Sequence, residues 1–322
     1  MSGSMTVIAA GMLAFVVGNV CAQGYPAKPL RLIVASSSGS GADIVARAVG
    51  QALGENLGQQ VIVENRAGAG GNLGAEMAAK SPPDGYTLFL VTSTFSINVS
   101  LYPKLKYDLQ RDFAPISLLL GNGCLVLITH PSFPARSVRE LIAVAKSKPG
   151  QVNYASAGIG NSLHLAGELF RSRGGINIVH VPYTGSGPAL TAVLGGEVPM
   201  AFMSLSALPH VRSNRLRALA VTSEQRSPSV PDIPTMMEAG VSGYTVTTWY
   251  GLLAPVKTPV EIINRLHGES VKVMQHPDMS KRFAADGLSA RASNPSELAG
   301  FLKQEIDLWA RVVREAKISI DD

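Results

Sequence analysis

Cysteine is scarce in this sequence of 322 residues, which holds only Cys21 and Cys124. We expect Cys21 to leave with an N-terminal signal segment, and the single remaining cysteine excludes an internal disulfide. Cys124 stands in the apolar run CLVLIT, which is typical of a small buried hydrophobic side chain rather than a nucleophile. The stability of the fold must therefore come from its hydrophobic core.

Charged residues are also few, at 16% of the chain, and the net charge is only +5. The lysines and arginines are dispersed, without a basic stripe or interleaved aromatic residues, so we expect no nucleic acid among the partners. The charged residues are also too few and too scattered for a disordered tail. A mild positive balance would help to attract anions, although it is weak evidence by itself.

Long apolar runs are confined to the N-terminus. Residues 5–18 (MTVIAAGMLAFVVG) contain no charge, but the run is shorter than the roughly 20 residues that a membrane-spanning helix needs. Small residues at 20–22 follow it, although no lysine or arginine precedes it. We predict that residues 1–22 are a secretory signal peptide, rather than a buried N-terminal helix, and that the mature protein is soluble and periplasmic.

The length and the order of the segments predict an α/β protein with two lobes. A chain of 322 residues exceeds the size at which one core usually keeps growing. Strand-like and helix-like segments alternate from residue 30 onward, which favours parallel sheets covered by helices. The first set has strands at 30–36, 60–65 and 86–93 and helices at 42–57 and 72–80. The second set has strands at 152–156, 178–183, 200–204 and 216–223 and helices at 137–148, 161–173 and 188–196.

Two crossings between these sets are expected to form a hinge. The first is the β-rich stretch 116–130, in which Gly121 and Gly123 interrupt the apolar pattern and are candidate hinge residues. The second is the strand-like segment 244–255, which could pair with the first as the chain returns. We therefore predict two Rossmann-like lobes joined by a two-strand hinge. Lobe 1 would comprise residues 23–122 and 227–322, and lobe 2 residues 123–226.

Ligand sites in open α/β sheets lie beyond the carboxyl ends of the strands. The loop after the first strand opens a helix, whose N-terminal N–H groups and partial positive charge suit an anion. Serine hydroxyls add donors there, and we expect Asp43 to cap the helix rather than to contact a ligand. The candidate ligand-binding residues of this loop are Ser36, Ser37, Ser38, Gly39 and Ser40.

Loops after other strands supply further candidates. The loop at 156–162 repeats the design of the first loop in lobe 2, so two helix N-termini could hold an acid from both sides of a cleft. Tyr183 could add an aromatic wall and a hydroxyl group. The further candidates are Ser93, Ser156, Ala157, Gly158, Gly160, Tyr183, Thr184, Gly185 and Ser204.

Patterns that would indicate catalysis are missing. The loop from Gly68 to Gly74 has the spacing G-x-G-x-x-x-G, and no acidic residue ends the next strand, which disfavours a dinucleotide site. His164 and Glu168 share a helix face without a second such pair, which favours a core role over a metal site. No G-x-S-x-G elbow occurs. We therefore expect no enzyme activity, no cofactor and no metal.

Across these loops the chain resembles the Bug-type periplasmic substrate-binding proteins of tripartite tricarboxylate transporters. The matching segments are YPAKPLRLIV (25–34), VIVENRAGAGGNLGAEMAAKSPPDGYTL (61–88), NYASAGIGNSLHLAGELF (153–170), VHVPYTGSGPALTAVLGGEV (179–198), LRALAVTSEQRSPSVPDIPTMMEAG (216–240) and GLLAPVKTPVEII (251–263). The resemblance implies a type II periplasmic-binding-protein fold whose lobes close on a small organic acid, usually a carboxylate. It also implies that segments 36–40 and 156–160, with 183–185 beside them, hold one carboxylate through backbone amides and ordered water. The partners would be the membrane permease subunits of a transporter, and we expect a monomer.

One loop departs from the family pattern. After the first strand the family usually has a proline, an aromatic residue, a glycine pair and an aspartate. Here Ala35 and Ser36 replace the proline and the aromatic residue, and Ser40 replaces the second glycine, while Asp43 is kept. We predict a more polar and roomier pocket at this wall, and a ligand that is larger, more hydroxylated or aromatic.

Two other functions stay open at the level of the sequence. A protein of the same fold could be a ligand sensor for a signalling partner. The presence of transporter genes beside the gene of this protein would favour transport over sensing. The loop from Gly68 to Gly74 could also serve a nucleotide-dependent oxidoreductase, which turnover with a nicotinamide cofactor would test.

Overall fold

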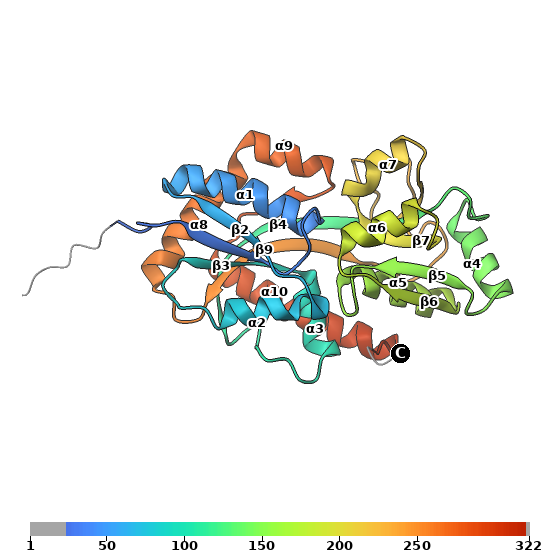
Figure 1. The fold of residues 1–322 in the computed structure, drawn as a ribbon, viewed down its shortest axis with the longest axis horizontal. Helices are drawn as coiled ribbons and strands as arrows, with labels where there is room; N and C mark the ends of the chain where they lie inside the picture. Colours follow the sequence, from blue (N-terminus) through green and yellow to red (C-terminus); the bar gives the residue numbers. More distant parts are fainter. Residues whose placement is uncertain (1–23, 320–322) are drawn as a thin grey trace, which may run out of the picture.

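The computed structural model of the chain describes residues 24–319, which form two α/β lobes side by side (Figure 1). The predicted signal peptide at 1–22, with Cys21, lies outside the described residues. Among the described helices, none is long and apolar enough to cross a membrane.

Lobe 1 is built on three parallel strands, β1 (Leu30–Val34), β2 (Val61–Asn65) and β3 (Thr87–Thr92). Their apolar runs bring Leu32 opposite Val63 on one side and Leu88 on the other. The connecting elements are α1 (Gly41–Leu57), the 3-10 turn η1 (Ala69–Gly71), α2 (Asn72–Ala79) and α3 (Ser93–Leu101). Because the strands run in one direction, the loops at their carboxyl ends meet at one edge of the lobe.

Lobe 2 repeats this design. Its parallel strands are β5 (Val152–Ser156), β6 (Ile178–Pro182) and β7 (Met200–Ser204), and β8 (Arg217–Val221) joins the sheet through the first crossing strand. Its helices are α4 (Val138–Ser147), α5 (Ser162–Gly174), α6 (Ser186–Leu194) and α7 (Leu208–Arg212), the last preceded by the 3-10 turn η2 (Leu205–Ala207). The loops after β5, β6 and β7 therefore also meet at one edge.

Two long antiparallel strands, β4 (Phe113–Thr129) and β9 (Thr247–Pro255), connect the lobes. β4 pairs with β9 over most of its length and with β7 and β8 at its far end. The β4–β9 register shifts between Leu120 and Gly123, and Asn122 between them has a φ of 57°. The pairing is therefore irregular at the stretch from which the sequence predicted its hinge residues.

The return to lobe 1, placed at residue 227 from the sequence, stays a prediction, and the segment that follows contacts the strands of lobe 2. Met236, Val241 and Tyr244 are buried in the same core as the strands of lobe 2. The Val246 amide donates a hydrogen bond to the carbonyl of Thr222, directly after β8. The segment is rich in turns and has no strand or helix periodicity, so only packing assigns it to lobe 2.

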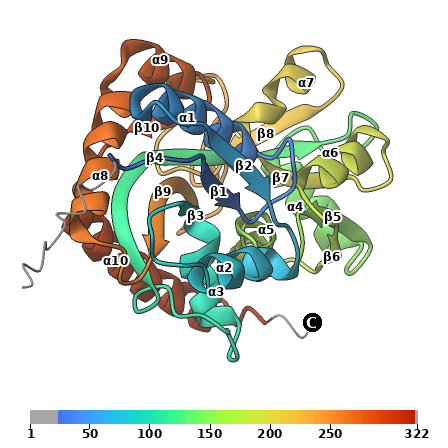
Figure 2. The same ribbon diagram turned by 60° about the vertical axis from the view of Figure 1, so that its left-hand side comes forward.

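The C-terminal elements complete lobe 1 and reach lobe 2. They are α8 (Val260–Gln275), α9 (Pro277–Ala285), the short strand β10 (Ser289–Ala290) and α10 (Pro295–Glu315). In Figures 1 and 2, α8 and α9 lie on lobe 1, whereas α10 runs on toward lobe 2. Near its end, Trp309 is buried in a hydrophobic cluster that joins the strands of lobe 2 to Ile97 and Leu101 of α3.

The strand order through both lobes is β2-β1-β3-β9-β4-β7-β5-β6, with β8 and β10 both paired to β4. Each lobe thus keeps a parallel strand set, and the antiparallel pair β4 and β9 stands between the two sets. The predicted fold class, two α/β lobes joined by two strands, is confirmed.

Candidate ligand-binding cleft

A cavity of about 660 Å³ lies between the lobes. Its walls are the loops after β1, β2, β3, β5, β6 and β7, together with the start of the returning strand β9. The strand-end rule applied to the sequence thus selects the side of each lobe on which this cavity lies.

The structure brings most of the predicted site residues to this cavity. Those that line it are Ser36, Ser37, Ser40, Ser93, Ala157, Gly158, Tyr183, Thr184, Gly185 and Ser204. The remaining four candidates, Ser38, Gly39, Ser156 and Gly160, are not among its lining residues. Direct contact of any of these residues with a ligand stays a prediction.

Ser38 and Gly39 lie on the outer side of the first loop, away from the cavity. The Gly39 amide donates a 2.9 Å hydrogen bond to Asp43 Oδ2, which also accepts one from Arg47. Burial raises the pKa of Asp43, but the hydrogen bonds from Arg47 and Gly39 outweigh it and leave the pKa below its usual range. The N-cap of α1 is Ser40, whose hydroxyl accepts from the Asp43 amide. Asp43 thus binds the first loop to α1 through its carboxylate, and Ser40 rather than Asp43 is the N-cap of α1.

Ser156 and Gly160 act within the loop before α5 rather than on the cavity. The hydroxyl of Ser156 accepts a hydrogen bond from the Gly158 amide at 3.1 Å. A Cβ atom on Gly160 would lie 2.6 Å from the ring of Tyr102 in lobe 1. Gly160 therefore permits close approach of the two lobes.

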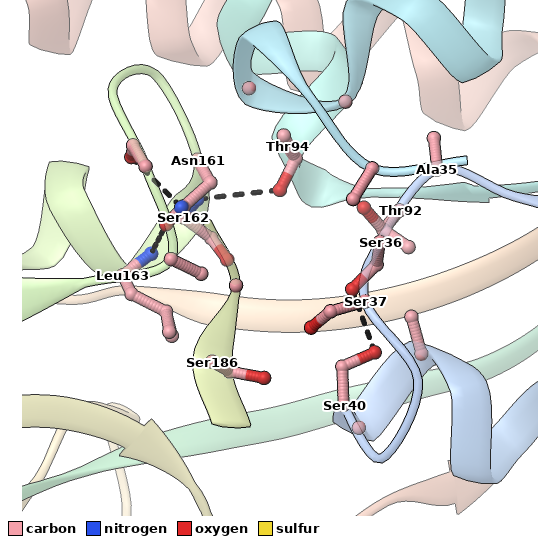
Figure 3. A pocket seen from close by; sticks show the side chains of 18 of the residues that line it. Ala35, Ser36, Ser37, Ser40, Thr92, Thr94, Asn161, Ser162, Leu163 and Ser186 are labelled. Carbon is pink, nitrogen blue, oxygen red and sulfur yellow. Dashed lines mark hydrogen bonds between the residues drawn. The ribbon is translucent and has the colours of Figure 1, made fainter. Parts of the chain in front are cut away.

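The helix N-termini at the cavity differ in a way that the sequence did not indicate. In α5, Asn161 accepts from the amides of Leu163 and His164, and the Ser162 amide donates to Thr94 of lobe 1 (Figure 3). α3 and α6 have no side-chain cap at all. The N–H groups of α5 are thus already engaged, and the start of α6, at Gly185 and Ser186, is the less satisfied donor site in lobe 2.

Several lining residues were not among the candidates. Thr92 and Thr94 flank the predicted Ser93, and their hydroxyl-rich loop at a strand end was the available signal. Phe95 follows directly after Thr94 of this loop. The other aromatic lining residues that were not candidates, Tyr102, Trp249 and Tyr250, come from elements that no ligand rule singles out. Trp249 and Tyr250 lie on β9, so only the return of the chain between the lobes places them in the cavity.

The cavity is uncharged: within the described residues, none of its lining side chains is Asp, Glu, Lys, Arg or His. Its polar groups are hydroxyls and amides, and the rest of the wall is aliphatic or aromatic. An anion here would be stabilised by N–H and O–H dipoles rather than by an ion pair.

The two lobes touch around the cavity. The Tyr102 hydroxyl donates to the Ile159 carbonyl at 2.9 Å, and a Cβ atom on Gly70 would lie 2.5 Å from the same oxygen. On the opposite side, a Cβ atom on Gly185 would lie 2.1 Å from the Ser37 hydroxyl. Gly70, in the G-x-G pattern, thus leaves room for the backbone of lobe 2. This close packing explains why a glycine stands at that position, and no bound nucleotide is needed to explain it.

Comparison with known proteins identifies the family. A family model described as the tripartite tricarboxylate transporter family receptor matches residues 45–318. The chain belongs to this family. Protein BugT of Bordetella pertussis is 40% identical over 305 residues, which are 94% of this chain and 93% of that protein. The resemblance to Bug-type proteins is confirmed, and membership of this receptor family implies a periplasmic location.

Solved structures in this receptor family share the fold. The periplasmic binding protein BugD matches with a TM-score of 0.88 at 32% identity, over 92% of this chain and 99% of that one. A Rhodopseudomonas palustris protein with adipate matches with a TM-score of 0.88 at 31% identity and the same coverage. MatC of that organism, with bound malate, gives 0.85 at 32% identity, over 90% of this chain and all of that one. The two-lobed periplasmic-binding-protein fold is confirmed.

Proposed function

We propose that this receptor captures a small organic acid in the cleft between its lobes and delivers it to the membrane subunits of a tripartite tricarboxylate-type transporter. The observation that supports this most is the uncharged cavity, walled by hydroxyls and helix N-termini from both lobes. Such a lining can replace the hydration of a carboxylate without a counter-ion. The relatives seen with malate and adipate bind carboxylates in the same fold.

The rest of the proposal concerns the setting of the protein. We propose export by the signal peptide at residues 1–22, removal of that segment, and action as a monomer in the periplasm. We also propose that the protein catalyses no reaction, and that binding acts through closure of the lobes. A ligand that contacts both lobes favours the closed arrangement by the contacts that only this arrangement offers.

The first loop supports a ligand with more bulk or more hydroxyls than a simple aliphatic diacid. Ser36 lines the cavity where the family pattern has an aromatic side chain, and its hydroxyl donates to Ser40 at 2.7 Å (Figure 3). Five aromatic residues, Phe95, Tyr102, Tyr183, Trp249 and Tyr250, line the same space. We therefore propose a larger, hydroxylated or aromatic acid.

A thermal-shift screen of the mature protein tests the proposal. The panel holds mono-, di- and tricarboxylates, acidic amino acids and aromatic acids. A ligand at about 100 times its Kd adds about 2.7 kcal/mol to the free energy of unfolding, which moves the midpoint by a few degrees. The proposal would be rejected if no acid of the panel shifts the melting temperature and native mass spectrometry finds no bound acid, while the protein binds or turns over a nicotinamide cofactor.

A further inference from the structure

Behind the cavity, lobe 2 contains a cluster of ionisable side chains that does not line it. The rings of His164 on α5 and His180 on β6 have centroids 4.1 Å apart. Tyr154 on β5 stacks on both rings, and its hydroxyl donates a 2.6 Å hydrogen bond to Glu168. Glu168 in turn pairs with Arg171 at 2.7 Å. His164 and Glu168 are nearly inaccessible to solvent, and His180 is partly buried.

Each histidine contacts the loop that precedes α5, which we call the cleft loop (residues 156–161). The Nδ1 atom of His164 accepts the Gly160 amide at 3.2 Å. The Nε2 atom of His180 lies 2.6 Å from the Ser156 hydroxyl, which accepts the Gly158 amide. Gly158 and Gly160 have φ values of 118° and 81°. Glycine can adopt many other backbone conformations, and the contacts with the histidines favour this one.

Ile159, the residue between those glycines, is where the cleft loop meets both the cavity and lobe 1. Ile159 lines the cavity, and its carbonyl accepts the hydrogen bond from Tyr102 of lobe 1. Gly158 lines the cavity as well. The histidines therefore fix, from behind, the piece of backbone that faces both the ligand space and the opposite lobe.

We propose that His164 and His180 are positioning residues of the receptor: together they hold the cleft loop in the conformation seen here, and protonation of His164, whose Nδ1 atom accepts the Gly160 amide, releases it. The proposal rests on the proposed function for its consequence in ligand binding, but not for the behaviour of the loop itself.

The hydrogen-bonding chemistry of the cluster explains why the loop contact depends on the protonation state of the imidazole. A protonated Nδ1 atom of His164 is a donor and could no longer accept the Gly160 amide. Burial, and then Arg171, lower the pKa of His164 to about 4. Burial, and then His164, lower the pKa of His180 to about 3, although Glu168 acts in the opposite direction. Within the described residues, the ionisable groups packed on the pair are Tyr154, Glu168 and Arg171. Both rings are thus neutral at pH 7 and take up protons only in acid.

Amide hydrogen exchange of the ligand-free protein, read by nuclear magnetic resonance, tests the inference. Gly160 should exchange slowly at pH 7, and its rate, corrected for intrinsic exchange, should rise as the pH falls below the pKa of a free imidazole, by on the order of a hundredfold near pH 4. His164→Asn keeps an acceptor near the Nδ1 position and should keep the protection without its acid dependence. His164→Phe keeps a ring but no acceptor, and Gly160 should exchange fast at every pH.

Unchanged protection of Gly160 in His164→Phe would overturn the proposal, and so would imidazole nitrogen shifts that show either ring charged at pH 6. Tyr154, in the neighbouring strand, reports whether the lobe itself stays folded. If His164→Phe does not fold, His164→Leu serves instead, because it also lacks an acceptor for the Gly160 amide and should leave Gly160 fast-exchanging at every pH. No ligand enters these measurements, so a chain that binds none of the acid panel leaves this test intact.

Discussion

The hydroxyl of Tyr102, directly after α3, donates a hydrogen bond of 2.9 Å across the cleft to the carbonyl of Ile159, in the loop before α5. The ring of Tyr102 also packs against Gly160, where a Cβ atom would lie 2.6 Å from it. Both contacts join the two lobes beside the cavity, so the lobe opening that we propose above would break them. We call this pair of contacts the latch.

Replacing Tyr102 by Phe should weaken this latch without disturbing the fold. Loss of one intramolecular hydrogen bond costs about 1 kcal/mol, so the affinity for the acid found in the thermal-shift screen should fall about fivefold. Isothermal titration calorimetry measures this, and small-angle scattering should show a more open ligand-free form. Tyr107→Phe is the matched control, because its hydroxyl bonds to Asn72 within lobe 1. Equal affinities for the two variants would refute a latch.

Gly185→Ala should prevent closure rather than folding. Its Cβ atom would lie 2.1 Å from the hydroxyl and 2.5 Å from the Cβ atom of Ser37 in the opposite lobe, and rotation of the hydroxyl cannot relieve the second contact, so the lobes would have to move apart. We expect the affinity to drop by about a hundredfold or more while the melting temperature of the ligand-free protein stays within a few degrees. Gly187→Ala, two residues on, meets nothing within 4 Å and should bind normally. A Gly185→Ala protein with unchanged affinity would show that closure does not bring these loops together.

Ser36→Phe should change which acids bind. The larger ring would fill part of the cavity and remove the Ser36–Ser40 hydrogen bond. Larger, hydroxylated or aromatic acids should lose affinity, and short aliphatic diacids should lose less. The thermal-shift panel compares the two profiles, with Ser38→Phe, in the same loop but off the cavity, as the control. An unchanged ligand profile would exclude this wall as a determinant of specificity.

Glu305→Gln should alter how stability depends on pH. Glu305 is buried and accepts a 2.7 Å hydrogen bond from the Trp249 indole, and burial raises its pKa although Trp249 and Trp309 act against the rise. Because the folded state binds this proton more tightly than the unfolded state, the wild type loses stability as pH rises through the raised pKa. The amide variant keeps an acceptor and cannot ionise.

Melting curves at several pH values check this expectation. The midpoint of Glu305→Gln minus that of the wild type should increase between pH 4 and pH 7. Asp307→Asn, at an exposed carboxylate on the same helix, is the matched control for the loss of one carboxylate. A constant difference for Glu305→Gln would mean that Glu305 has the same pKa in both states.

Local sequence patterns predict the helices and strands better than they predict which lobe each segment belongs to. Apolar strands followed by helices with Ser or Asn at the start are visible in the sequence, and the structure has them near the expected positions. The segment around Met236 and Tyr244, for which the sequence predicts lobe 1, packs against strands of lobe 2. It has no periodicity, and its burial depends on a core made by distant strands.

The candidate site shows the same division. The rule of strand carboxyl ends selects ten of the lining residues from the sequence alone. It cannot tell that Asn161 and Thr94 occupy the amides of α5, because the bond to Thr94 depends on the distance between two lobes. Nor can it place Trp249 in the cavity, since that residue reaches it by the path of β9 between the lobes.

The sequence by itself determined the two-lobed α/β architecture and the loops that face the cleft, because strand and helix periodicity and helix-start residues act over a few positions. The family came from the resemblance of whole segments of the chain. Only the tertiary structure decided which N–H groups are already bonded, which residues latch the lobes, and which histidines support the cleft loop. Those properties depend on atoms far apart in the chain, such as Tyr102 and Ile159 or Ser156 and His180, which come into contact only when the chain has folded.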